Sequence, residues 1–324
     1  MRISIFGMGY VGIVSAACLA RDGHHIVGID PNLTKVELVN SGQTPIIEQD
    51  MPEMVKAAVD AGRLTATTDD RHALMNTELS LVCVGTPSRD NGSLDLRHVQ
   101  NVCRQIGEVL RDKNEFHTVV MRSTMLPGSM RDTVKRQLES ASGKIAGRDF
   151  GLCNNPEFLR EGSAVYDYFN PPKTVIGELE SASTLAGDQL VSLYKDLDAP
   201  LIRTSVEVAE MVKYVDNTWH AVKIGFGNEI GRICKAKSID SHEVMDIFIQ
   251  DRKLNISSAY LKPGFAFGGS CLPKDLRALS YMARSADLEV PLLDSVLPSN
   301  QKQVAIACDM ISQAGNKQVG LLGL

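Results

Sequence analysis

The sequence predicts an α/β protein: a doubly wound parallel sheet, followed by a long central helix and an all-α domain. Three observations predict this class. Short β-rich runs alternate with helical stretches through the first two hundred residues, and a glycine-rich motif follows the first run. A segment of about thirty residues without proline comes after them.

Four short runs are the clearest predicted strands, at residues 3–6, 26–29, 79–84 and 118–121. Helical stretches separate them, which is typical of a parallel sheet. Each run ends in a glycine-rich or polar segment, at residues 7–12, at Asp30, at residues 85–87 and at residues 123–128. Because ligands of such sheets bind at the carboxyl ends of the strands, we expect a ligand at these segments.

Composition and charge exclude some functions. The chain has 324 residues, 44% of them hydrophobic and 23% charged, with a formal net charge of −5 and a pI near 5.8. A nucleic-acid-binding protein normally has a basic face, so that class is disfavoured. No run reaches the roughly 18 uninterrupted apolar residues of a membrane span, and glycines interrupt the apolar N-terminus, which argues against a secretion signal.

The seven cysteines include no C-x-x-C pair, so they fit neither a disulfide framework nor a zinc site. We therefore predict no metal site and a cytoplasmic protein. Most free cysteines are small buried hydrophobic residues, and this is the interpretation for Cys18, Cys83 and Cys234.

The long predicted helix runs from Thr204 to about Ala236, and Thr204 with Glu207 resembles a capping box. Such a length favours a helix that bridges domains or subunits, so we expect a homo-oligomer built on it. One apolar stripe follows the helix, made of Val208, Val212, Val215, Trp219, Val222, Phe226, Ile230 and Ile233.

Lys213, Asn217 and His220 form a polar row on a different face of this helix. For an isolated helix, a solvent-exposed row is the simpler interpretation, since lysine is mostly exposed. A lysine and an amide that reach one point would also suit the stabilisation of an oxyanion, and spacing alone does not decide between the two.

The motif Gly7-Met8-Gly9-Tyr10-Val11-Gly12 lies between a predicted strand and a predicted helix, and Asp30 closes the next strand. A glycine motif alone could be a tight turn. With the strand, the helix and the acid in register, it predicts a Rossmann-like dinucleotide site, in which Gly7, Gly9 and Gly12 let the backbone approach a pyrophosphate. Asp30 suits a free ribose 2′-hydroxyl and would repel a 2′-phosphate, so the expected cofactor is NAD.

The segment Phe267-Gly268-Gly269-Ser270-Cys271-Leu272-Pro273-Lys274-Asp275 places a thiol before a predicted helix and beside two charged groups. A helix N-terminus and a lysine both favour the thiolate, which is the reactive form of cysteine. A neighbouring carboxylate could take a proton or activate water. Cys271 is therefore the candidate nucleophile among the seven cysteines.

Three further segments are ambiguous by themselves. Residues 155–162 carry two acids, Glu157 and Glu161, that could simply favour a helix N-terminus. The Ser123-Thr124 pair and the Gly85-Thr86-Pro87 segment could be turn chemistry or cofactor contacts.

The chain divides into three predicted parts: a cofactor-binding domain at 1–200, a central helical domain with the cysteine segment at 201–300, and a linker with a first strand at 301–324. The last run, at 319–324, is typical of a strand that opens a further α/β unit. On this ground we expect the chain to be cut short at the start of that unit.

Taken in order along nearly the whole chain, the motifs resemble those of the UDP-glucose/GDP-mannose dehydrogenase family. They are G-x-G-Y-V-G at Gly7, G-T-P at Gly85, S-T at Ser123, N-P-E-F-L-x-E-G at Asn155, K-x-x-x-N at Lys213 and F-G-G-S-C-x-x-K-D at Phe267. Residues 206–214, 219–221 and 263–267 most resemble the family's GDP-mannose 6-dehydrogenase branch, which makes GDP-mannuronate for alginate synthesis.

The resemblance implies a four-electron oxidation with NAD, in which Cys271 holds the sugar as a thiohemiacetal and then as a thioester that water hydrolyses. It also implies a role for each matching residue. Lys213 and Asn217 would stabilise oxyanions, Asp275 would assist proton transfer, and Thr124 and Glu157 would orient the reacting centre. The cofactor would contact Tyr10, Val11, Lys35, Thr86, Thr124 and Glu161, and the sugar nucleotide would contact Glu161, Lys213, Asn217, His220, Tyr260 and Lys262.

Three other interpretations stay open. The same chemistry could act on UDP-glucose or a UDP-N-acetylhexosamine, because the core motifs are shared. A β-hydroxyacid dehydrogenase, which transfers a single hydride, also joins a Rossmann domain to a long helix with a lysine, but needs no thiol. A non-catalytic NAD-binding or oligomerisation module is the third.

Overall fold

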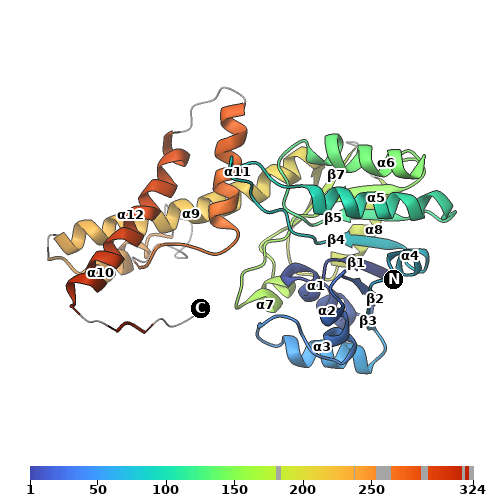
Figure 1. Ribbon diagram of the computed structural model, residues 1–324, viewed down its shortest axis with the longest axis horizontal. Helices are drawn as coiled ribbons and strands as arrows, with labels where there is room; N and C mark the ends of the chain where they lie inside the picture. The colour runs from blue at the N-terminus through green and yellow to red at the C-terminus, as the bar shows by residue number, and fades with distance from the viewer. Residues whose placement is uncertain (180–183, 237, 253–263, 286–290, 316–317, 321–324) are drawn as a thin grey trace. The chain divides into compact units, whose positions relative to one another are not determined.

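The computed structural model describes residues 1–324 apart from 180–183, 237, 253–263, 286–290, 316–317 and 321–324 (Figure 1). The chain forms two compact units. The first comprises Met1–Pro87 and Leu94–Lys213, and the second comprises Ser88–Ser93 and Tyr214–Leu324. A short excursion between Pro87 and Leu94 therefore belongs to the second unit.

The first unit is built on an eight-stranded sheet with the order β3-β2-β1-β4-β5-β6-β7-β8. All neighbouring strands are parallel except β6 and β7, which pair antiparallel. The four strands predicted from the sequence are β1, β2, β4 and β5, so these predictions are confirmed. The strands are β1 Arg2–Phe6, β2 His25–Ile29, β3 Leu64–Thr67, β4 Leu79–Val82, β5 Thr118–Met121, β6 Gly151–Asn154, β7 Thr174–Glu178 and β8 Leu201–Ser205.

Helices cover the sheet through two separate hydrophobic clusters, as a doubly wound sheet requires. One cluster includes side chains of α1, α3, α7 and α8, and the other includes side chains of α4, α5, η1 and α6. The helices of the first unit are α1 Tyr10–Arg21, α2 Leu33–Asn40, α3 Met51–Asp60, α4 Asp70–Met75, α5 Arg97–Asp112, the π-helix η1 Met130–Lys135, α6 Arg136–Ser142, α7 Ala164–Phe169 and α8 Leu185–Tyr194.

The long helix α9 spans Val206–Ala236, 31 residues, which is about 46 Å at 1.5 Å per residue. Its predicted start is wrong by two residues. Thr204 belongs to β8, because that strand pairs with β7 as far as Ser205 opposite Glu178. The Ser205 hydroxyl lies 3.5 Å from the Val208 amide, so Ser205 takes the capping position expected of Thr204.

The second unit is helical. Besides the rest of α9 it contains α10 Ser241–Phe248, α11 Leu272–Ser285 and α12 Pro291–Gln313. A small core of Ala221, Phe267, Leu276 and Val296 joins α9, α11 and α12. The excursion at Ser88–Ser93 packs on α11, since a Cβ on Gly92 would lie 3.4 Å from the Arg277 carbonyl oxygen and 3.6 Å from the Tyr281 Cβ.

Two remaining expectations concern the C-terminal segment and membranes. The strand predicted at 319–324 falls mostly outside the described residues, and residues 318–320 take no regular structure. None of the described helices is long and apolar enough to cross a membrane.

A buried polar network joins β1, β4 and the residue before β5. The hydroxyls of Ser4 on β1 and Ser80 on β4 are 2.7 Å apart, and Ser80 Oγ lies 2.8 Å from His117 Nε2, just before β5. His117 Nδ1 lies 3.1 Å from the Thr77 carbonyl oxygen. Burial, and then the charge of Lys113, lowers the pKa of His117 to about 3, so the ring is neutral in the folded chain.

We expect His117 to make the fold sensitive to acid. Between pH 6.5 and 3 the unfolded chain binds a proton at this ring that the folded chain excludes, so stability falls as the pH falls through that window. A His117→Gln variant should be less stable than the unaltered protein at pH 7.5 by about 1–3 kcal/mol. By pH 4.5 this difference should largely vanish. Urea unfolding at both pH values measures it, and a difference independent of pH would contradict the assignment.

Candidate active site

The glycine motif after β1 forms a turn that requires glycine at positions 7 and 12. Gly7 has a φ of +91°, and its amide donates to the Ile29 carbonyl oxygen at 2.7 Å. A Cβ on Gly12 would lie 1.8 Å from the Gly7 carbonyl oxygen, which forbids any side chain. A Cβ on Gly9 would meet nothing within 4 Å, so the backbone there is open to a ligand. This is the arrangement expected for the approach of a pyrophosphate.

Helix α1 begins directly after Gly9, and no side chain caps it. Its first amides, at Tyr10, Val11 and Gly12, therefore point out of the helix N-terminus, where the helix dipole favours an anion. Together with the open Gly9, this uncapped end fits the diphosphate of a dinucleotide.

Asp30 is fixed at the end of β2. Its side chain is buried, Oδ2 accepts from the Met8 amide at 2.9 Å, and Oδ1 accepts from the Asn32 amide at 2.9 Å. The Lys35 amine donates to Oδ2 at 3.2 Å, which brings two of the predicted cofactor residues together. The carboxylate position agrees with the recognition of a ribose hydroxyl.

Tyr10 is held by an acid that the sequence analysis missed. The Tyr10 hydroxyl donates to Glu48, whose buried carboxylate also accepts from the Gly162 amide at 2.8 Å and the Ala164 amide at 3.2 Å. Burial, and then Glu48, raises the pKa of Tyr10 above its ordinary value. Glu161 is exposed beside this cluster. Glu48 lies 38 residues from Tyr10, and no local motif marks it.

The loops that follow β4 and β5 are joined by side-chain hydrogen bonds to the backbone. The Thr86 hydroxyl donates to the Thr124 carbonyl oxygen at 2.7 Å, and the Ser123 hydroxyl donates to the Val84 carbonyl oxygen at 2.7 Å. Thr86 and Thr124, which the sequence left ambiguous, thus lie side by side. The carboxyl ends of neighbouring parallel strands meet at one edge, which explains this contact.

The loop after β6 carries a buried ion pair. Lys213 Nζ on α9 lies 2.9 Å from Glu157 Oε1, and both side chains are less than a tenth exposed. Burial alone would raise the Glu157 pKa, but the Lys213 amine and the Leu159 amide stabilise the carboxylate, so the pKa lies below its ordinary value. The alternative that Glu157 and Glu161 start a helix is wrong, because α7 begins only at Ala164.

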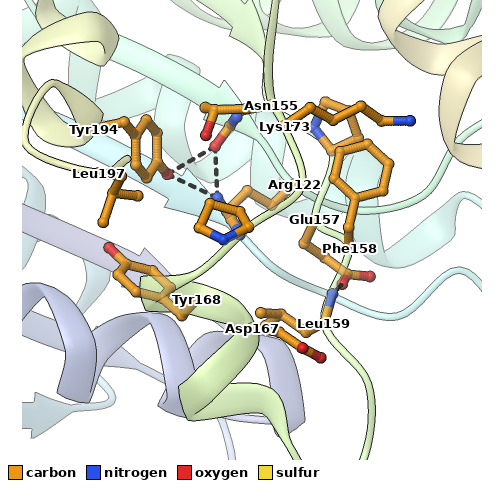
Figure 2. A pocket seen from close by; sticks show the side chains of 13 residues that line it. Arg122, Asn155, Glu157, Phe158, Leu159, Asp167, Tyr168, Lys173, Tyr194 and Leu197 are labelled. Carbon is orange, nitrogen blue, oxygen red and sulfur yellow. Dashed lines mark hydrogen bonds between the residues drawn. The ribbon is translucent and has the colours of Figure 1, made fainter. Parts of the chain in front are cut away.

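A cavity of about 40 Å³ lies beneath this loop (Figure 2). Arg122 Nη1 donates to Asn155 Oδ1 at 2.5 Å and to the Tyr194 hydroxyl oxygen at 2.8 Å, and the Tyr194 hydroxyl donates to the same Asn155 oxygen at 2.8 Å. Asn155 Nδ2 donates to the Val175 carbonyl oxygen at 2.8 Å. Arg122, which sequence analysis also missed, therefore fixes the base of the loop that carries Glu157.

In the second unit, Cys271 immediately precedes α11 and is exposed. Asp275 is buried in the first turn of that helix, where its amide donates to the Cys271 carbonyl oxygen at 2.8 Å. Lys274 Nζ lies 3.2 Å from Asp275 Oδ1, at ion-pair distance but without hydrogen-bond geometry. Asn217 on α9 donates its amide to the other oxygen of Asp275, so two predicted catalytic residues are in contact.

Two asparagines hold the segment that leads to Cys271. Asn228 Nδ2 donates to the Phe265 carbonyl oxygen at 3.0 Å, and Asn228 Oδ1 accepts from the Gly264 amide at 2.8 Å. Asn300 on α12 makes the same pair of bonds with Phe267, both at 2.8 Å. The glycine-rich backbone before the thiol is thereby anchored to two helices.

The other cysteines differ from Cys271. All seven are free, and Cys18 and Cys234 are buried as expected, while Cys83 is half-buried. Burial raises the pKa of the Cys18, Cys103 and Cys153 thiols to about 12, which makes them poor nucleophiles. Cys308 on α12 is the second exposed thiol.

The simpler interpretation of the polar row on α9, exposure to solvent, is wrong for two of its members. Lys213 and Asn217 are buried, at 5% and 8% exposure, and each contacts a carboxylate. His220 is half-buried. Tyr260 and Lys262, the other predicted contacts of the sugar nucleotide, lie outside the described residues.

An uncapped helix end behind three glycines and a fixed acid at the end of β2 define a protein of the dinucleotide-binding class. The match to known families makes the class specific. Residues 1–198 match the NAD binding domain of the UDP-glucose/GDP-mannose dehydrogenase family, and residues 207–302 match its central domain.

Individual relatives agree. GDP-mannose 6-dehydrogenase of Pseudomonas savastanoi pv. phaseolicola is 54% identical over 100% of this chain and 73% of its own length. UDP-glucose 6-dehydrogenase of Haloferax volcanii is 36% identical over 100% of this chain and 76% of its own. A solved ternary complex of GDP-mannose dehydrogenase from Pseudomonas aeruginosa has a TM-score of 0.78 and 53% identity, and the match covers 100% of this chain and 74% of that one.

The chain belongs to the UDP-glucose/GDP-mannose dehydrogenase family. It is an NAD-dependent oxidoreductase, and the resemblance stated from its motifs is confirmed.

We expect the Lys213–Glu157 pair to be essential to the stability of the first unit. A Lys213→Met variant leaves the Glu157 carboxylate buried without its cation, which should cost about 3–5 kcal/mol at pH 7. Adding Glu157→Gln should recover part of that loss. The deficit of the single variant should shrink as the pH falls toward 4.5, the ordinary glutamate pKa, because burial without Lys213 raises the Glu157 pKa and the carboxylate is then neutralised in the folded state first. Urea unfolding measures all three, and a Lys213→Met variant as stable as the unaltered protein would show that the pair is not formed.

Proposed function

We propose that the chain oxidises the C6 alcohol of GDP-mannose to the carboxylate and so makes GDP-mannuronate, an alginate precursor. The observation that carries this proposal is the identity over the whole chain to GDP-mannose 6-dehydrogenases, which is well above that to the UDP-glucose 6-dehydrogenase. The free thiols of all seven cysteines support a reducing, cytoplasmic location.

The overall reaction removes four electrons from the sugar. One alcohol, two NAD⁺ and one water give one carboxylate, two NADH and three protons. The glycine turn, Asp30 and Lys35 would hold NAD, which would supply the hydride acceptor for each of the two oxidations. The aldehyde carbon is captured by the Cys271 thiolate, which forms a C–S bond, and the second oxidation turns this thiohemiacetal into a thioester. Water then cleaves the C–S bond and restores the thiol.

The proposed roles of the protein side chains follow from their chemistry. The buried amine of Lys213, which pairs with Glu157, can stabilise an oxyanion on the sugar carbon. Asn217 can donate its second amide hydrogen to the same oxyanion, since Asp275 orients the amide. Asp275 is the proposed proton acceptor, and Thr124 and Glu157 are proposed to orient the reacting centre.

Further side chains are proposed as binding contacts. Tyr10, Val11, Thr86, Thr124 and Glu161 would line the cofactor site, and the fixed positions of Tyr10 and Thr86 support this assignment. Glu161, Lys213, Asn217, His220, Tyr260 and Lys262 would contact the sugar nucleotide.

The stoichiometry of NADH formation tests the chemistry. With limiting GDP-mannose, the full chain should form two NADH per sugar. Cys271→Ser should lower the rate of carboxylate formation by about 10³-fold or more, because a hydroxyl at this position is not ionised. Cys308→Ser is the matched control, since Cys308 is also an exposed thiol, and its rate should be unchanged.

Each contrary outcome has a distinct meaning. One NADH per sugar, or full turnover by Cys271→Ser, would refute the thioester route and favour a single hydride transfer. Faster oxidation of UDP-glucose than of GDP-mannose would refute the substrate. Binding of NAD without NADH formation on any nucleotide sugar would indicate a non-catalytic module.

We also propose that two copies of the chain associate through α9. Four members of its apolar stripe are about half exposed, namely Val208, Val215, Trp219 and Phe226. A long helix with such a stripe is typical of a surface that a second subunit covers.

Light scattering tests the association. The unaltered protein should have twice the 35.3 kDa mass of one chain. Trp219→Lys places a charge in the stripe and should give a monomer at concentrations of about 1–10 µM, a range in which weakened interfaces dissociate. Leu33→Lys, on an exposed leucine of α2, is the control and should leave the mass unchanged. A monomeric unaltered protein would contradict the proposal.

A further inference from the structure

Glu210 is a buried carboxylate on α9 that lies outside the proposed catalytic and binding contacts. Its side chain is only 2% exposed. Its two oxygens accept from the backbone of the loop after β5: Oε2 from the Gly128 amide at 2.8 Å and Oε1 from the Met130 amide at 2.9 Å. Both carboxylate oxygens therefore accept from one short backbone segment, residues 128–130.

The charged groups that face Glu210 do not neutralise it. Glu207 lies one turn earlier on the same helix, and Arg131 lies directly after the bound amides. Arg131 pairs with Glu207 at 2.5 Å instead and donates to the Leu179 carbonyl oxygen at 2.6 Å. A buried carboxylate held by amides alone is costly, which indicates that its position has a purpose beyond packing.

Glu210 stands at the centre of a chain of contacts through the candidate site. One helical turn beyond it, Lys213 reaches Glu157 on the loop after β6. The loop that Glu210 binds contains Thr124, whose carbonyl oxygen accepts from Thr86 on the loop after β4. Three loops at the carboxyl ends of β4, β5 and β6 are thus connected to one another through the first two turns of α9.

We propose that Glu210 is a positioning residue, which fixes the Lys213 amine relative to the Thr124 loop by holding the Gly128 and Met130 amides. The proposal rests on the role suggested above for Lys213. Glu210 itself touches neither substrate nor cofactor in this scheme. Glu210 fixes the position of α9 relative to the loop after β5. The Lys213 amine therefore does not move when negative charge develops on the substrate.

The protonation state of Glu210 should alter this connection near neutral pH. Burial raises the Glu210 pKa to about 7, against the opposing effect of the two amides. The ionised form accepts strongly at both oxygens, whereas the protonated form has a weakly accepting hydroxyl oxygen. The connection should therefore weaken as the pH falls through 7.

Glu210→Gln is the principal test. It keeps the shape of the side chain but turns an NH₂ group toward one of the two amides. Glu207→Gln is the matched control. Glu207 lies one turn before Glu210, and its carboxylate forms a partly exposed ion pair with Arg131. A second control, Val55→Ala in the buried face of α3, provides a destabilised variant in the other hydrophobic cluster of the first unit, which does not include Met130.

The readouts separate positioning from stability. We expect acylation of the Lys213 amine, followed by mass spectrometry, to be about 10-fold faster in Glu210→Gln than in either control, because the amine is less firmly held. We expect kcat to fall by about 10- to 100-fold, with the KM for NAD changed less than about 2-fold. Equal labelling rates in Glu210→Gln and the controls would overturn the proposal.

Amide exchange in the unaltered protein provides a measurement that needs no variant to fold. After correction for intrinsic rates, protection of the Gly128 and Met130 amides should decrease as the pH falls from 8 to 6, and constant protection would overturn the proposal. Labelling and exchange do not require turnover. If the unaltered chain fails to oxidise GDP-mannose, the proposed function fails, and these two measurements still decide the role of Glu210.

Discussion

The candidate site depends on one ion pair, between Lys213 and Glu157, from which water is largely excluded. Two opposite charges gain little from each other in water and much more in a dry environment, but only if the protein supplies the rest of their solvation. Here the Leu159 amide supports the carboxylate, and the Phe158 ring lies 5.6 Å from the amine. The loop after β6 and the start of α9 must therefore be rigid before the pair can form, and much of the surrounding structure serves that rigidity.

The parallel sheet supplies the loops, and buried polar side chains fix them. Strands β1, β2, β4, β5 and β6 end in the glycine turn, Asp30, the Thr86 loop, the Thr124 loop and the Glu157 loop. Arg122 anchors the last of these from below, and Glu48 anchors Tyr10 from the side. Arg122 donates to the Asn155 side chain, and Glu48 accepts from the Gly162 and Ala164 amides. Each charged side chain thus provides a hydrogen-bond partner for polar groups of these loops.

Local signals in the sequence were sufficient for the glycine turn, Asp30, four strands, the long helix and the cysteine segment, because each has a short-range pattern with a physical cause. Glu48, Arg122 and Glu210 were missed, since their partners lie 38, 33 and 80 to 82 residues away. Burial of Lys213 and Asn217 could not be predicted from helical spacing, which fixes a face but not what covers it. The start of α9 was misplaced because pairing between β7 and β8 overrides the capping preference of Thr204.

The six residues from Ser88 to Ser93 have a consequence for how the protein can be divided. They belong to the helical unit, although both neighbours in the chain belong to the sheet unit, so the backbone passes between the two units three times rather than once. A cut after Lys213 would leave this excursion, including the Gly92 backbone that packs on α11, without its support. The boundary between the two family domains in the sequence therefore does not separate the two compact units, because a division there would part Ser88–Ser93 from the helix on which it packs.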